Sequence, residues 1–169
     1  MFVLFSVKIY ISTIQMVSMT FIQDSGSVFE APLEMVWKLA KDHVEHGNKI
    51  HPNTRNKKTE IIDETSFINT WEQDDENGQT IRMKVKGSSF YPLGIAFEIL
   101  VGPFADSKYF VYYFPIDNDN NKIGVTMVGN FKSNVIPEEQ IKPTVLGLLE
   151  KVFSEDVAYL NEIKQKEDH

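Results

Sequence analysis

The feature that most constrains the fold of this chain is its C-terminal segment, which has the pattern of one long amphipathic helix. Between Pro137 and about Lys164, apolar residues recur at helical spacing. They form one wide apolar face: Ile141, Val145, Leu148, Leu149, Val152, Phe153, Val157, Leu160 and Ile163. A helix of that length is about 40 Å long but only about 10 Å across. Its apolar face must be buried, so the rest of the chain has to supply a surface for it.

Six segments before this helix alternate apolar and polar residues in the way that is typical of β-strands. They cover residues 59–64, 66–73, 80–86, 95–101, 108–116 and 122–132. The second and third are joined by the turn-forming run Asp74–Gly78. Strands joined by such short turns predict an antiparallel meander.

A strand and a short helix precede the meander. Residues 20–30 have a strand pattern that leads into Ala31 and Pro32, where proline suits the first turn of a helix. The helical pattern covers residues 32–46 and ends near His46 and Gly47, since glycine favours the left-handed conformation of a helix end. The order is therefore strand, helix, six strands and long helix, and 169 residues are typical of one domain.

The widths of these elements predict a curved sheet. Seven strands spaced about 4.8 Å apart make a sheet about 34 Å wide. One helix about 10 Å across cannot cover a flat sheet of that width, so we expect the sheet to curl around it. The predicted fold class is α+β, with a seven-stranded curved antiparallel sheet that grips the long C-terminal helix. The space between the concave face and the helix is either filled by large side chains or left as an apolar pocket.

Residues 1–16 are separate from this predicted single domain, which covers residues 17–169. Their apolar and polar side chains alternate as in a strand, and the one charged residue, Lys8, lies inside the apolar run. That position disfavours a secretory signal and a stable membrane insertion. Two interpretations stay open: an extra N-terminal strand, or a natural start at Met16 or Met19.

Charge and composition exclude several classes of function. The chain has 17 basic and 24 acidic residues, a formal net charge of -7, so we expect no nucleic-acid binding. It has no cysteine, which excludes disulfides and thiolate chemistry and fits a reducing compartment; we predict a cytoplasmic protein. The glycine-rich nucleotide signatures are absent, and we expect no cofactor.

Two short segments, together with the order of elements, carry a resemblance to a known group of proteins. Ala31 and Pro32 are followed by Val36 and Trp37, and the closing segment is Glu150–Leu160. The chain resembles the helix-grip superfamily, the START, Bet v 1-like and polyketide cyclase-like group also called SRPBCC. The resemblance covers residues 17–165 and concerns fold more than chemistry.

This resemblance implies an internal cavity that binds a hydrophobic or amphipathic small molecule such as a lipid, a sterol or a polyketide. We favour such a binding protein over an enzyme. Two alternatives stay open. One is an enzyme of the cyclase, aromatase or dehydratase kind that uses the same cavity. The other is a co-chaperone-like interaction module with a filled interior.

The predicted cavity residues follow from strand alternation and from the apolar stripes of the two helices. Asn69 is distinctive among them, because a polar side chain on an apolar face needs a partner that a ligand could supply. The full set is Trp37, Phe67, Asn69, Trp71, Met83, Phe97, Tyr112, Met127, Leu149, Val152 and Phe153. Each side chain could instead be plain core, because buried aromatic residues mostly pack against one another.

The segment 108–116 has aromatic residues at both strand parities, so its orientation is less constrained. We expect Phe110, Tyr112 and Phe114 to face the interior. Tyr109, Val111 and Tyr113 would then face outward and form the contact of a homodimer.

Three histidines lie close together in the sequence: His43, His46 and His51. Imidazole is a common metal ligand, but the H-E-x-x-H spacing is absent, and a helix end before a polar loop commonly carries exposed histidines. We therefore predict no metal site, and we assign no catalytic residue. In the enzyme alternative, His51, Tyr112 and Asn69 are the acid–base or orienting groups.

Overall fold

The computed structural model describes residues 19–75, 77–116, 118 and 121–167. Eight strands and two helices follow one another in this part of the chain. Their bounds are β1 (Thr20–Gln23), β2 (Ser27–Phe29), α1 (Leu33–Ile50), β3 (Arg55–Ile61), β4 (Ser66–Asp74), β5 (Thr80–Phe90), β6 (Gly94–Val101), β7 (Lys108–Pro115), β8 (Ile123–Phe131) and α2 (Glu138–Glu167).

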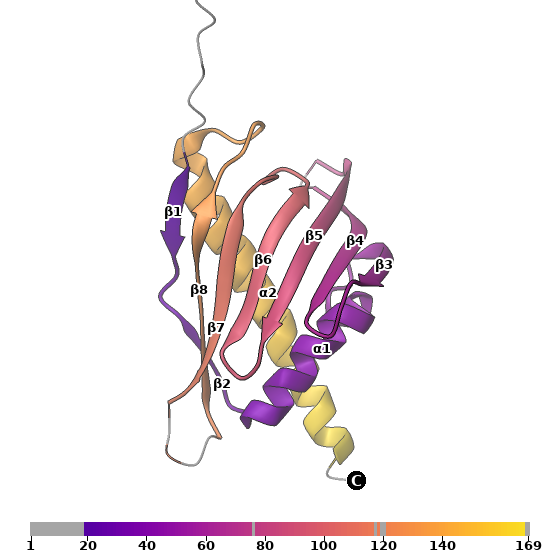
Figure 1. Ribbon diagram of the computed structural model, residues 1–169, viewed down its shortest axis with the longest axis vertical. Helices are drawn as coiled ribbons and strands as arrows, with labels where there is room; N and C mark the ends of the chain where they lie inside the picture. The colour runs from indigo at the N-terminus through magenta and orange to yellow at the C-terminus, as the bar shows by residue number, and fades with distance from the viewer. Residues whose placement is uncertain (1–18, 76, 117, 119–120, 168–169) are drawn as a thin grey trace, which may run out of the picture.

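The strands form one antiparallel sheet in the order β1-β8-β7-β6-β5-β4-β3, and β2 also pairs with β8. Figure 1 shows α2 running diagonally across one face of this sheet, with α1 beside its lower half. A curved, unclosed antiparallel sheet around a long C-terminal helix is the helix-grip fold, and the predicted fold class is confirmed. Neither helix in the described residues combines the length and apolar character that crossing a membrane requires.

Within the described residues the sheet has eight strands rather than seven, because the strand predicted at 20–30 is divided in two. Asp24 lies between β1 and β2, and its Oδ1 accepts hydrogen bonds from the backbone N–H of Gly26 (3.0 Å), the hydroxyl of Thr126 (2.6 Å) and the N–H of Met127 (3.1 Å). Gly26 has φ +77°, which side-chain-bearing residues rarely adopt. This turn lets both short strands pair with β8. The other six strands lie where they were predicted, although β3 begins earlier. The extra strand considered for residues 1–16 lies outside the described residues.

Helix α1 extends to Ile50, past the end predicted near His46 and Gly47. Its backbone is not helical at His46 (φ -132°, ψ 27°), so the helix kinks there and continues for one more turn. Two side chains of β3 donate hydrogen bonds to carbonyls beside the kink: Lys57 to that of His43, and Thr59 to that of Val44 at 2.6 Å. Burial lowers the pKa of Lys57 to about 8. The predicted helix end near His46 and Gly47 is therefore wrong by one turn, and Gly47 does not adopt the left-handed conformation expected of it.

The buried core lies near both ends of α2, where this helix packs against the sheet and against α1. One cluster joins the first turns of α2 to β1, β5, β6 and β8: Ile22, Met83, Val85, Ile99, Phe104, Met127, Phe131, Ile141 and Val145. A second joins α1 to the end of α2 and β8, and it includes Phe29, Val36, Leu39, Ile50, Ile123 and Leu160. A third places Trp37 and Ala40 of α1 on Phe67 and Ile95 of the sheet.

Candidate functional site

Strand β7 is inverted relative to the sequence-based prediction. Tyr109, Val111 and Tyr113 pack against the interior clusters, whereas Tyr112 and Phe114 are each 42% exposed on the outer face. The predicted inward orientation of Tyr112 is therefore wrong, and so is the outward face proposed for a homodimer. Pairing register is the reason. Residues directly opposite each other share a face, and Val111 lies opposite Met127, which is buried.

Several side chains in the middle of the concave face are half-buried. Trp71, Phe97, Tyr109, Val111 and Tyr113 stand on this face and stay half-buried. The ring of Tyr109 stacks on that of Phe97, with centroids 5.0 Å apart. Burial raises the pKa of the hydroxyls of Tyr109 and Tyr113 above the ordinary value of 10. Like any tyrosine, both are protonated hydrogen-bond donors at neutral pH. These side chains therefore keep part of their surface accessible to water, although neither of the two hollows described below lies between the sheet and α2.

Trp37 of α1 closes one end of this face. Its ring lies 5.6 Å from that of Tyr113 and 5.2 Å from that of Tyr91, centroid to centroid. The indole Nε1 is buried and has no hydrogen-bond partner among the described residues. An unpaired buried N–H is costly, and a bound acceptor would remove that cost.

The other predicted cavity residues divide into three groups. Phe67, Met83 and Met127 are buried in the core clusters. Asn69 is also buried, and its side-chain amide lies 2.8 Å from the Thr59 hydroxyl oxygen. Because the one proton of that hydroxyl is donated to the Val44 carbonyl, the amide N–H₂ of Asn69 would be the donor in this contact, so a side chain already supplies one partner. On α2, Leu149 and Phe153 are half-buried and pack against these clusters.

Val152 departs from its predicted position, because it is 39% exposed. The line of α2 that faces the interior runs through Ile141, Val145, Leu149, Phe153, Asp156, Leu160 and Ile163. Val152 lies beside this line rather than on it. The apolar face of α2 is wider than the strip that the sheet and α1 cover. The sequence pattern predicted the whole apolar face but did not distinguish its covered residues from its exposed ones.

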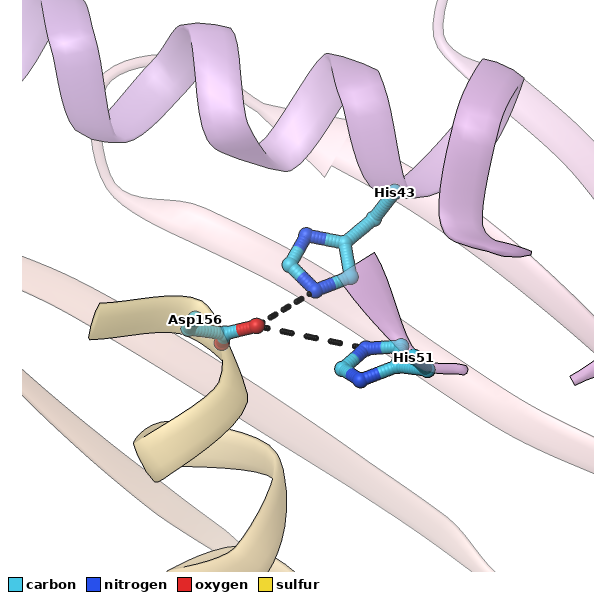
Figure 2. Close-up of side chains that lie close together, drawn as sticks. All are labelled: His43, His51 and Asp156. Atoms are coloured by element: carbon cyan, nitrogen blue, oxygen red, sulfur yellow. Dashed lines mark hydrogen bonds and ion pairs between the residues drawn. The ribbon is translucent and has the colours of Figure 1, made fainter. Parts of the chain in front are cut away.

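A polar cluster lies where α1 meets α2. Asp156 is only 8% exposed, and its Oδ1 lies 2.9 Å from Nε2 of His43 and 3.9 Å from Nε2 of His51. Figure 2 shows the carboxylate of Asp156 between the two imidazole rings. Each ring also has a partner at its other nitrogen: His43 Nδ1 lies 2.9 Å from the Leu39 carbonyl, and His51 Nδ1 lies 2.6 Å from Glu155 Oε2.

The cluster also acts on the concave face through its charge. Burial is the main cause of the raised pKa of Tyr113, and the negative charge of Asp156 is the second cause. Burial also lowers the pKa of His51, helped by the neighbouring His43, while Glu155 and Asp156 act in the opposite direction. A neutral His51 is thereby favoured near neutral pH.

Chain topology, rather than local sequence, assembles this cluster. His43 and Asp156 are 113 positions apart, and the kink at His46 precedes the turn that leads to His51. His46 itself stays outside the cluster, with its side chain 47% exposed. Sequence analysis missed Asp156, although a signal was present: it is the one charged residue on the otherwise apolar interior line of α2.

Two hollows open on the outside of the molecule. One of about 390 Å³ lies over β5, β6 and β7, and its outward-facing lining includes Lys86, Glu98 and Phe110. The other, about 440 Å³, lies between the end of α1 and β3 and is lined by residues such as Glu45, Asn48 and Arg55. The lining of the first also includes apolar residues such as Ala96 and Val128, whereas the lining of the second is mostly polar and does not suit a purely hydrophobic ligand.

Comparison with known proteins supports the fold. No family model matches the sequence, and no curated protein sequence matches it. Among solved structures, the Zhui aromatase/cyclase from Streptomyces sp. R1128 is 15% identical, with a TM-score of 0.66 over 88% of this chain and 96% of that one. Norcoclaurine synthase from Thalictrum flavum, solved with dopamine and hydroxybenzaldehyde, is 10% identical, with a TM-score of 0.63 over 95% of both chains.

A START superfamily protein from Mycobacterium smegmatis is 12% identical, with a TM-score of 0.64 over 85% of this chain and 98% of that one. Such low identities establish a shared architecture and leave chemistry open. The chain shares the helix-grip fold of these structures, as its sequence predicted.

Proposed function

We propose that this protein binds a hydrophobic or amphipathic small molecule between the concave face of the sheet and α2. The observation that carries this proposal is the row of half-buried side chains in the middle of that face, which includes Phe97, Tyr109, Val111 and Tyr113. Covering apolar surface stabilises a complex by about 2–3 kcal/mol for each 100 Å² removed from water. A ligand with apolar area would gain that energy here.

Polar groups beside the row favour an amphipathic ligand over a pure hydrocarbon. The buried Nε1 of Trp37 lacks an acceptor in the part of the chain that the structure describes, and Tyr109 and Tyr113 carry hydroxyl donors. A carbonyl or hydroxyl oxygen on the ligand would satisfy such donors. The architectural relatives give limited support, since two of them are named for an aromatase/cyclase and for a synthase bound to small aromatic molecules.

A matched pair of substitutions on β7 tests the site. Val111→Trp places a large ring on the concave face, whereas Tyr112→Trp changes its neighbour on the outer face. We expect the first variant to lose binding of an environment-sensitive probe such as anilinonaphthalene sulfonate, and the second to keep it. Native mass spectrometry of the wild-type protein from its own host should show a co-purifying small molecule.

Thermal unfolding of the same variants separates binding from a filled interior. If Val111 faces free space, the added ring is accommodated and Tm changes little. A filled interior, as the co-chaperone-like alternative requires, would make Val111→Trp destabilising by about 1–3 kcal/mol because of overpacking. A large loss of Tm together with no probe binding in the wild type would exclude the proposed site.

An enzyme of the cyclase, aromatase or dehydratase kind is a second candidate, and one observation favours it. The imidazoles of His43 and His51 each contact a carboxylate beside the concave face, an arrangement that suits proton transfer. Tyr112 has no role in it, because this side chain is exposed on the outer face. If a compound recovered from the protein is converted, His51→Ala should abolish conversion, and unchanged conversion would leave binding as the function.

Three further predictions remain without a test. The homodimer, if formed, would use the outward aromatic side chains Phe110, Tyr112 and Phe114 instead of the inward ones. The acidic net charge remains the argument against nucleic acid. The absence of cysteine remains the argument for the cytoplasm.

A further inference from the structure

We infer that His43, His51 and Asp156 form a binding site for one divalent transition-metal ion of the zinc class. One ligand atom from each residue lies within 4.8 Å of the other two. In tetrahedral coordination with metal–ligand bonds of about 2.0–2.1 Å, ligand atoms are about 3.3 Å apart. The separations of 2.9 Å and 3.9 Å from Asp156 Oδ1 to the two Nε2 atoms lie on either side of that value. The remaining separation, between the two Nε2 atoms, is at most 4.8 Å, so the two imidazoles would have to move closer together around the ion.

The hydrogen bonds at the far nitrogens orient both imidazoles for metal binding. The Leu39 carbonyl can only accept, so the nitrogen of His43 that faces it, Nδ1, must carry a proton. In the same way, the Glu155 carboxylate accepts from Nδ1 of His51. Both neutral rings then present the lone pair of Nε2 to Asp156. Fixing of the tautomer by a carbonyl or carboxylate is the outer-shell arrangement typical of metal-ligating histidines.

The contact between His43 and Asp156 itself calls for a cation. A lone pair on Nε2 would face an ionised oxygen at 2.9 Å, which is repulsive unless a proton or a metal ion lies between them. Asp156 is buried, and a buried carboxylate requires a compensating charge. Glu155 adds a second negative charge, and the amine of Lys57 donates to the backbone carbonyl of His43. A divalent ion would balance the two carboxylates.

Two imidazoles and one carboxylate suit zinc, iron, cobalt or manganese in the divalent state. Three protein ligands leave a coordination position open, as in catalytic rather than structural metal sites. Water would occupy that position, or an oxygen atom of a bound small molecule. The inference does not rest on the proposed ligand binding, because it concerns the metal alone.

Calorimetric titration of Zn²⁺ into the full chain, purified without a histidine tag and freed of metal by a chelator, tests the site. We expect one ion per chain in the wild type. Each of the variants His43→Ala, His51→Ala and Asp156→Asn should weaken Zn²⁺ binding. The loss should be no smaller than the roughly 10- to 100-fold loss that is typical when an outer-shell partner is removed. His46→Ala is the matched control, since this histidine belongs to the same helix but stays outside the cluster, and it should leave affinity unchanged.

Two further readouts keep the test decisive if a variant folds poorly. Zn²⁺ should raise the Tm of the wild type, because a ligand that binds only the native state stabilises it. Co²⁺ in place of Zn²⁺ should give the visible absorption of a low-coordinate imidazole–carboxylate site. The inference is overturned if the wild-type chain takes up no Zn²⁺, or if His46→Ala weakens binding as much as Asp156→Asn does.

Discussion

The start and the middle of α2 bury the same helical face to different extents. Near the start, Ile141 and Val145 are almost fully buried against β1, β8 and neighbouring strands. In the middle, Leu149 and Phe153 are half-buried, and the interior line then carries Asp156. The helix packs on the sheet near its start and on α1 near its end, where Leu160 is buried again. One apolar stripe can therefore support a filled core and an uncovered surface a few turns apart.

The largest expected change in stability comes from two truncations on α2, which test this contrast directly. Ile141→Ala should lower the free energy of unfolding by about 2–5 kcal/mol, because a fully buried side chain leaves a cavity. Leu149→Ala should lower it by roughly 1–2 kcal/mol, since less of its surface leaves water on folding. Urea unfolding of the two variants measures the difference. Equal losses would mean that the middle of α2 is as tightly packed as its start.

A pair of glycines provides a second, smaller test. A Cβ on Gly87 of β5 would collide with the ring of Phe67, so Gly87→Ala should destabilise the protein by about 1–3 kcal/mol. Gly147 of α2 has no heavy atom near its Cβ direction, so Gly147→Ala should stabilise the protein by about 0.5–1 kcal/mol through helix propensity. Thermal unfolding reports both signs. If Gly147→Ala lowered Tm, the outer side of α2 would be in contact with something.

The smallest effect concerns Asp63, an exposed carboxylate whose partners contrast with those of Asp156. Asp63 accepts hydrogen bonds from the backbone N–H groups of Thr65 and Ser66, each at 2.8 Å, and these bonds, that of Thr65 first, hold its pKa below the ordinary value of 3.8. The stabilisation that these hydrogen bonds provide is fully present above the pKa that Asp63 has in the unfolded chain. It is lost as pH falls through the lower pKa of the folded state.

Unfolding curves of the wild type and of Asp63→Asn, recorded from neutral to acidic pH, check this prediction. The stability advantage of the wild type should be constant at neutral pH and shrink below about pH 4. A pH-independent difference would show that the hydrogen bonds do not depend on ionisation. Because N–H donors satisfy Asp63, it needs no cation, whereas Asp156 faces two imidazoles.

Much of the fold followed from local pattern. The turn run at Asp74–Gly78 and the alternation on either side predicted a hairpin, and β4 and β5 pair there from Asp74 and Thr80 onward. Local pattern worked because one face of each of these strands is wet and the other is buried. It failed on β7, where both faces carry aromatic rings and the register to β6 and β8 decides which face is inside.

The candidate site was less predictable, for two separate reasons. Tyr112 was chosen instead of Tyr113 because the orientation of β7 was not evident from its composition. The polar cluster was missed because its members lie on different helices, and nothing near His43 or His51 in the sequence refers to Asp156. The charged position on the apolar line of α2 was the only local sign of it.

By itself, the sequence determined the identity and order of the elements and, through their widths, the curl of the sheet around its helix. These properties depend on periodicity and on short-range turn chemistry, which neighbouring residues encode. Tertiary structure alone decided which face of β7 is inside, how far α2 covers the concave surface, and where the carboxylate of Asp156 lies. Those outcomes depend on pairing register and on contacts between residues more than a hundred positions apart, which no local pattern specifies.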